Sequence, residues 1–410
     1  MRGDATGNAF RVGAGRTGVA PIATLVVAAL ASLFMAWSIG AGSSGSTPFA
    51  PAVGANAVSV MRAGFLVGIL GFAGAVLQGA NVTEAVGTAL IDGVALTAGA
   101  ATVGLLVAAL LVAVGVFAGY PIATAFTVTG AVVGVGLALG GDPAWAKYRQ
   151  IAALWVGTPF VGGGAAYATA VLLRDDRVPE TTAVPALGGI VGLIAVNVGF
   201  SPLAPGAASA SLAAALGGRV DAALGTAVGS VAVSGLAAVL AALVLRRDMT
   251  PDPAVGQRHF LLVLGGLVAF SAGGSQVGLA LGPLVPLLGG VDLPLTAVLV
   301  GGGLGLLVGS WTGAPRMIKA LSQDYSSLGP RRSIAALIPS FAIAQTAVAF
   351  GIPVSFNEVI VSAIVGSGYA AGGAGVSREK MGKTVLAWIG SLALALAGSY
   401  AAFAAVDAVL

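Results

Sequence analysis

The 410-residue sequence has no cysteine and only one histidine, and each shortage excludes a kind of site. Without cysteine the chain can form neither disulfides nor thiolate metal sites. With His259 as its only histidine, it can build neither a histidine metal cluster nor a Ser/His/Asp triad. No catalytic dyad stands out elsewhere, so we expect no enzyme.

Charge is also scarce, because Asp, Glu, Lys and Arg together make up only 8% of the chain, whereas a soluble domain has about 25%. Hydrophobic residues make up 57%, and apolar stretches long enough to cross a bilayer core of roughly 30 Å recur throughout. The net charge of +4 lies mostly in short basic loops, which orient membrane proteins, and it is not a nucleic-acid signal. The sequence therefore predicts a multi-pass protein of the cell membrane.

Ten long apolar segments are expected to be helices, because a backbone inside lipid must satisfy its own hydrogen bonds. They lie near residues 20–40, 63–80, 95–118, 149–173, 183–203, 222–245, 259–281, 293–311, 333–351 and 384–407. The first follows three arginines, as in a signal peptide, but the many later spans favour its retention as a helix. Four shorter pieces, interrupted by glycine or proline, lie near residues 46–60, 122–141, 281–292 and 353–373. We expect an all-α protein with about 10–12 transmembrane segments, some of them re-entrant or broken.

The two halves of the chain share one pattern, which indicates an internal duplication. The stretches Gly119–Gly141 and Gly351–Gly373 both start with a glycine and a proline two residues apart, and both end in two glycines. A constant shift of 232 residues pairs Pro121, Ala131, Val133, Gly134, Gly136, Ala138, Gly140 and Gly141 with identical residues of the second stretch. A shift of 233 residues also pairs Lys147 with Lys380, Trp155 with Trp388, Ser38 with Ser271 and Gly40 with Gly273.

Short, interrupted segments at matching places in two halves are a pointer to the binding site of a transporter. A helix that begins inside the membrane has free N–H groups at its N-terminus, where an anion is favoured. We expect Pro121 and Pro353 in the first turn of two such half-helices, because the N–H that proline lacks would be unpaired there. Hydroxyl groups just after each proline can then bind the oxygens of an ion.

These segments resemble the inorganic phosphate transporter (PiT) family of sodium- or proton-coupled permeases. The two proline-led stretches are similar to its paired Gly-x-Pro-Val-Ser-Thr-Thr-His segments, and "WSIGAGSSGSTPF" from Trp37 and "FSAGGSQVGLALGPL" from Phe270 are similar to its two Asn-Asp motifs. The resemblance covers most of residues 25–175 and 259–405 and implies two inverted repeats. The implied division is an N-terminal tail (1–19), a first repeat (20–175), connecting spans (176–258) and a second repeat (259–410).

The chain departs from the family at the positions that carry coordination chemistry. The Asn-Asp positions read Gly42-Ser43 in the first half and Ser275-Gln276 in the second. The Ser-Thr-Thr-His positions read Ala-Thr-Ala-Phe in the first half, which keeps Thr124, and Ser-Phe-Asn-Glu in the second, which keeps Ser355. The resemblance thus implies the scaffold, while the substrate and the coupling ion stay open.

The candidates for substrate binding are hydroxyl and amide side chains of these motifs. They are Ser43, Ser44, Thr124, Thr127, Ser275, Gln276, Ser355 and Asn357. Hydroxyls and glycines around Ser43 can gather main-chain N–H groups about an anion, as in a nest. The structural alternatives are a re-entrant turn without a ligand, a threonine bonded to its own helix, and simple helix packing through small polar residues.

Two carboxylates, Glu358 and Glu84, are the candidates for binding the coupling ion, a proton or sodium. A carboxylate at membrane depth is expensive and is a functional hypothesis by default. Glu358 stands at the histidine position of the family motif and can share a helical face with Ser355. The alternatives are a structural ion pair for Glu358 and a helix-start role for Glu84.

The resemblance implies a secondary active transporter, a symporter of inorganic phosphate that works by alternating access and needs no cofactor besides its coupling ion. Because the Asn-Asp pairs are missing, a permease for another oxyanion such as sulfate stays open. So does a degenerate membrane sensor or scaffold that transports nothing. The partners implied are phosphate or a similar oxyanion, the lipid bilayer and a second copy in a homodimer, with no nucleic acid.

Overall fold

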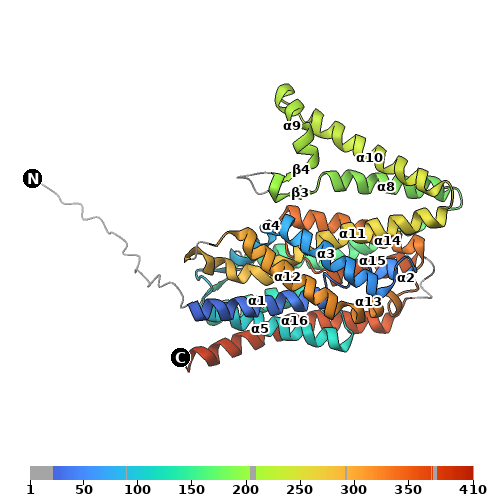
Figure 1. Cartoon of the computed structure of the whole chain (residues 1–410). Helices are drawn as coiled ribbons and strands as arrows, with labels where there is room; N and C mark the ends of the chain where they lie inside the picture. The colour runs from blue at the N-terminus through green and yellow to red at the C-terminus, as the bar shows by residue number, and fades with distance from the viewer. Residues whose placement is uncertain are drawn as a thin grey trace, which may run out of the picture.

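The computed structural model describes residues 22–88, 90–203, 209–290, 293–370, 372 and 376–409, so the expected N-terminal tail lies outside it. Figure 1 shows a bundle of long helices, with α8, α9 and α10 set apart from it on one side. The helices of the first half are α1 (Ile22–Gly42), α2 (Ala50–Gly54), α3 (Val60–Gln78), α4 (Ala80–Thr88), α5 (Ala98–Ala118), α6 (Thr124–Ala138) and α7 (Trp145–Leu172).

The connecting and second parts are also helical, and the strands are very short. The connecting helices are α8 (Glu180–Val196), η1 (Ser201–Leu203), α9 (Leu212–Leu224) and α10 (Val228–Met249). The second part holds α11 (Pro253–Leu281), η2 (Gly282–Gly290), α12 (Leu295–Thr312), α13 (Ala314–Gln323), α14 (Pro330–Ala349), α15 (Phe356–Tyr369) and α16 (Arg378–Asp407). Two antiparallel pairs join β1 (Ile91–Asp92) to β2 (Asp142–Pro143), and β3 (Gly199–Phe200) to β4 (Ala210–Ser211).

The all-α multi-pass fold expected from the sequence is confirmed. Within the described ranges, nine helices are long and apolar enough to cross a membrane, and α6 and α8 are shorter apolar helices. The expected span 183–203 is shorter than predicted, because α8 ends at Val196 and the chain enters β3 and η1. Helix α1 belongs to the bundle, since the Ser32 hydroxyl donates to the carbonyl of Ala280 on α11 at 2.8 Å.

Helices α6 and α15 begin inside the bundle, and the expectation that proline lies in their first turn is wrong. Each proline instead lies three residues before its helix, in an extended segment that follows a glycine with positive φ. Gly119 (φ +72°) and Gly351 (φ +60°) turn the chain there, which a residue with a side chain does at a cost. The segment from glycine to helix brings main-chain carbonyls, rather than the proline ring, into the bundle.

The two copies of the duplicated pattern pack in a reciprocal way. Helix α6 packs against α16, and its counterpart α15 packs against α7. A Cβ atom at Gly134 would lie 2.3 Å from the carbonyl oxygen of Leu396, and one at Gly366 would lie 2.1 Å from that of Gly163. Each half-helix thus rests, backbone against backbone, on a long helix of the other half. The inverted relation and the repeat boundaries stay predictions.

We predict that Gly366→Ala destabilises the protein, because its methyl group would enter the space of the Gly163 carbonyl. Overpacking of this kind costs about 1–3 kcal/mol, more than the helix propensity that alanine adds. A lower thermal unfolding midpoint in detergent would show it. Gly164→Ala is the matched control, since nothing lies within 4 Å of a Cβ there. Equal midpoints for the two variants would contradict the packing argument.

Candidate functional site

Four polar side chains predicted from the motifs meet in the interior and form what we call the central cluster: Ser43, Thr124, Gln276 and Asn357. Ser43 follows α1, Thr124 starts α6, Gln276 lies within α11, and Asn357 is in the first turn of α15. All four are at most 1% exposed. Residues more than 300 positions apart in the sequence are therefore brought together where both half-helices begin.

The amide of Gln276 is the centre of this cluster. Its Oε1 accepts hydrogen bonds from the hydroxyls of Ser43 (3.1 Å) and Thr124 (2.7 Å), and its Nε2 donates to the carbonyl of Val354 (2.6 Å). Ser43 and Gln276 occupy equivalent positions of the duplicated pattern, so the two former Asn-Asp positions bond directly to each other. This contact joins the two halves at their common centre.

Asn357 makes the corresponding link from α15. Its Nδ2 donates to the carbonyls of Ile122 (2.6 Å) and Gly42 (2.9 Å). Ile122 and Val354 are equivalent positions in the extended segments before the two half-helices. Each carbonyl therefore receives a side-chain amide donor, from Asn357 in one case and Gln276 in the other.

Four buried oxygen atoms of residues in the central cluster, or within two positions of it in the sequence, have no protein partner: Ser275 Oγ, Ser355 Oγ, Asn357 Oδ1 and Glu358 Oε2. Within the described residues, only three other buried side-chain polar atoms lack a partner. A buried polar group left unpaired costs about 1–3 kcal/mol, so such groups are rare and need an explanation. Their concentration in the predicted motifs makes this place the candidate site for a polar ligand.

Glu358 is the acidic group of the site. It is 1% exposed and lies in the first turn of α15, where the helix dipole stabilises a negative charge. The ion pairs of the described chain join other residues, so the structural alternative of an arginine partner does not hold. Its equivalent in the first copy, Phe126, stacks on Trp155 with ring centroids 3.9 Å apart.

The other candidates lie differently. Ser44 is buried next to Ser43, and Thr127 donates to the carbonyl of Ala123 in its own helix at 3.0 Å, as the structural alternative expected. Glu84 is exposed on α4 and is not part of the central cluster. The main-chain carbonyls that complete the cluster were not predicted, because no side chain marks them in the sequence.

Sequence reasoning also missed a second polar network, formed by Gln78, Gln345 and Ser271. Gln345 Nε2 donates to Ser271 Oγ (2.5 Å) and to Gln78 Oε1 (3.3 Å), while Gln78 Nε2 donates to the carbonyl of Gly199 (2.8 Å). Glutamine within an apolar span is the signal that could have found it, because polar groups at membrane depth are costly.

A helical bundle that spans the membrane and brings two broken helices to one buried polar cluster has the architecture of a membrane transporter, not of an enzyme. Residues 39–399 match the model of the phosphate transporter family, so the chain belongs to that family. This confirms the resemblance seen in the motifs and the multi-pass membrane location.

Relatives agree with this assignment. The chain is 24% identical to inorganic phosphate transporter 2-1, chloroplastic, of Arabidopsis thaliana over 415 residues, covering 88% of this chain and 68% of the relative. It is 24% identical to a protein of Thermococcus kodakarensis named as a phosphate permease, covering 89% and 93%. The solved structure of the sodium-dependent phosphate transporter has the same fold, with a TM-score of 0.78, 21% identity and coverage of 95% of this chain and 100% of that one.

Asn357→Leu is expected to destabilise the fold, because it leaves the carbonyls of Ile122 and Gly42 without a donor. Each unpaired carbonyl should lower the free energy of unfolding by about 1–3 kcal/mol. Thermal unfolding of the purified protein measures the effect. Thr127→Val is the matched control, since the Thr127 hydroxyl bonds only within its own helix. If the unfolding midpoint of Asn357→Leu falls no further than that of Thr127→Val, the hydrogen bonds of Asn357 do not stabilise the fold as proposed.

Proposed function

We propose that the protein is a secondary active transporter that carries inorganic phosphate across the membrane by alternating access around the central cluster. The observation that carries this proposal is the set of buried, unpartnered oxygens where both half-helices begin. A permanent structural core would satisfy these groups. A transporter needs such groups free, because they must bind and release the substrate and the coupling ion in each cycle.

The chemistry of the site suits an oxyanion. The first N–H groups of α6 and α15 are not used within their helices, and the dipoles of both helices favour a negative charge at that end. The hydroxyls of Ser275 and Ser355 can donate to phosphate oxygens, and those of Ser43 and Thr124 can do so when they leave Gln276. Ser44 and Thr127 lie in the same segments as Ser43 and Thr124, and we include them in the proposed site.

The same site explains why transport would be coupled to a cation. A carboxylate and an oxyanion repel each other strongly in a low-dielectric interior. Glu358 therefore admits the anion only when a proton or a sodium ion arrives with it. The unpartnered oxygens of Glu358, Asn357 and the two serines are of the donor type that a hard cation takes, so the residues also fit sodium. We keep Glu84 as a second, peripheral coupling candidate.

Sulfate is the second substrate to consider, because the Asn and Asp side chains of the family motifs are replaced here by neutral hydroxyl and amide groups. An ionised carboxylate can accept a hydrogen bond from the proton that phosphate retains near neutral pH, whereas sulfate has no such proton, so a site with fewer carboxylates discriminates less against sulfate. A sensor or scaffold that transports nothing would leave the buried oxygens of the site without a role.

Reconstitution into liposomes tests the proposal. Uptake of labelled phosphate and sulfate is measured under an imposed sodium gradient, an imposed proton gradient and no gradient. We expect gradient-driven phosphate uptake, and the gradient that drives it identifies the coupling ion. Uptake of sulfate but not phosphate would show that sulfate is the substrate. No uptake of either anion under any gradient would refute transport.

Glu358→Gln is expected to abolish the stimulation by the gradient while leaving anion exchange across the membrane intact. The amide keeps the shape of the side chain but can neither release a proton nor neutralise a sodium ion. A coupling free energy of about 1–3 kcal/mol corresponds to a roughly 5–150-fold effect of the cation on the affinity for the anion, and this effect should be lost. Asp407→Asn, at the exposed end of α16, is the control. Undiminished stimulation in Glu358→Gln would exclude Glu358 as the coupling residue.

A further inference from the structure

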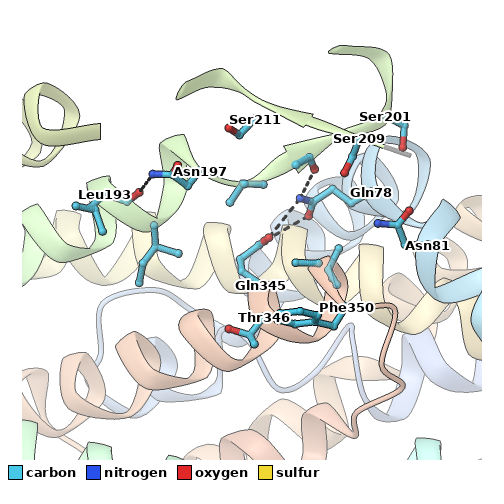
Figure 2. A pocket seen from close by; sticks show the side chains of 15 residues that line it. Gln78, Asn81, Leu193, Asn197, Ser201, Ser209, Ser211, Gln345, Thr346 and Phe350 are labelled. Carbon is cyan, nitrogen blue, oxygen red and sulfur yellow. Dashed lines mark hydrogen bonds between the residues drawn. The ribbon is translucent and has the colours of Figure 1, made fainter. Parts of the chain in front are cut away.

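A second polar site lies next to the network of Gln78, Gln345 and Ser271. Figure 2 shows a pocket between α8 and the β3–β4 pair on one side and α3 and α14 on the other. Its volume is about 490 Å³. Eight of its fifteen lining residues carry an amide or a hydroxyl, and none is charged. Prominent among the polar ones are Gln78, Asn81, Asn197, Ser209, Gln345 and Thr346.

This neutral polar lining distinguishes the pocket from its neighbour. A neighbouring pocket of about 530 Å³, between α8, α10 and α11, is lined mainly by apolar side chains such as Val191, Val244 and Val263. Such a lining suits lipid chains. The amides and hydroxyls of the first pocket would be costly against hydrocarbon, so that pocket is built for water and polar solutes.

The network of Gln78, Gln345 and Ser271 meets the pocket through its two glutamines, which belong to the lining. It joins α3 of the first half to α14 and α11 of the second, and Gln78 also holds the carbonyl of Gly199 on β3. Figure 2 shows the two glutamines facing each other beneath the strands. These hydrogen bonds therefore connect the parts of the molecule that must separate if a path is to open here.

Two segments lead from this network to the central cluster. On α11, Ser271 lies one turn before Ser275, whose buried hydroxyl has no partner. From the end of α14, Phe350 in the pocket lining is followed by the extended segment that carries Val354, the main-chain acceptor of Gln276. The network thus lies at the start of both segments that run from the pocket to the proposed substrate site.

We propose that this pocket is the vestibule through which the oxyanion reaches the central cluster, with the hydrogen bonds of Gln78, Gln345 and Ser271 as its inner gate. The inference rests on the proposed transport function. Neutral amide and hydroxyl groups replace part of the hydration shell of an anion without holding it as an arginine or lysine would. Binding that is favourable but weak is what a transit site requires.

The gate suits its task because opening it exchanges hydrogen bonds instead of losing them. Both N–H bonds of each glutamine amide are used within the closed network. When the network opens, the same N–H groups can donate to the oxygens of the passing anion. Since a hydrogen bond within the protein is only slightly more favourable than the one that replaces it, such an exchange is readily reversible.

The absence of native cysteine makes the vestibule directly testable. Asn81→Cys is treated in detergent with a membrane-impermeant thiosulfonate reagent and then reconstituted. We expect loss of phosphate uptake after modification, and slower modification when inorganic phosphate is present. Ser327→Cys, at an exposed position outside this pocket, is the matched control and should be modified without loss of uptake or protection by phosphate.

The outcomes separate the vestibule from the transport function. If the native chain takes up phosphate but fully modified Asn81→Cys does so equally well, the vestibule is refuted and the function stands. If the native chain takes up no anion and phosphate does not slow the modification, both are refuted. Protection by anionic phospholipid, but not by inorganic phosphate, would overturn the proposal in favour of a site for lipid headgroups.

The gate is tested by the accessibility of the cluster behind it. Ser275→Cys should react slowly with the same reagent, because Ser275 is completely buried. Adding Gln345→Ala is expected to increase its reaction rate, whereas adding Ser340→Ala should not, since the Ser340 hydroxyl bonds only to its own helix at Ala336. Equal rates in the two double variants would refute the gate. Circular dichroism verifies that each variant is folded.

Discussion

The structure depends on how two helices can begin inside a membrane-spanning bundle. The extended segments that lead into α6 and α15 have main-chain carbonyls that no helix satisfies. The bilayer core holds no water that could pair with them. Ile122 and Val354, which are equivalent positions, each accept a hydrogen bond of 2.6 Å from a side-chain amide. These two bonds allow both half-helices to start at the same buried point, and the polar cluster is a consequence of that arrangement.

The donors of these two bonds show how far the two copies have diverged. Asn357 comes from α15 itself, whereas Gln276 comes from α11, so the copies satisfy equivalent carbonyls in different ways. The position of Glu358 is held by Phe126 in the first copy, where stacking on Trp155 replaces polar chemistry. Three of the four unpartnered oxygens of the site, those of Ser355, Asn357 and Glu358, lie at the start of the second half-helix.

Much of this was predictable because hydropathy and repetition are local signals. The long spans, the short interrupted segments and the duplicated positions follow from residue type alone. Pairing is not local: nothing in the sequence indicates that Gln276 binds Ser43, or that Gln78 and Gln345 face each other across 267 residues. The placement of Pro121 and Pro353 was wrong for a related reason, because the preceding glycine, not the proline, sets the direction of the chain.

The extended segments that lead into the two half-helices are covered by different groups, so the two sides of the molecule are not equivalent. The segment after Gly351 starts at the polar pocket. Its counterpart after Gly119 is covered instead by Lys380, whose ammonium lies 4.4 Å from the ring centre of Tyr120 and forms an ion pair of 3.3 Å with Asp324. If the two halves work by alternating access, the closure at Lys380 and the amide gate at Gln345 must open in turn, because opening both would leave a continuous polar channel.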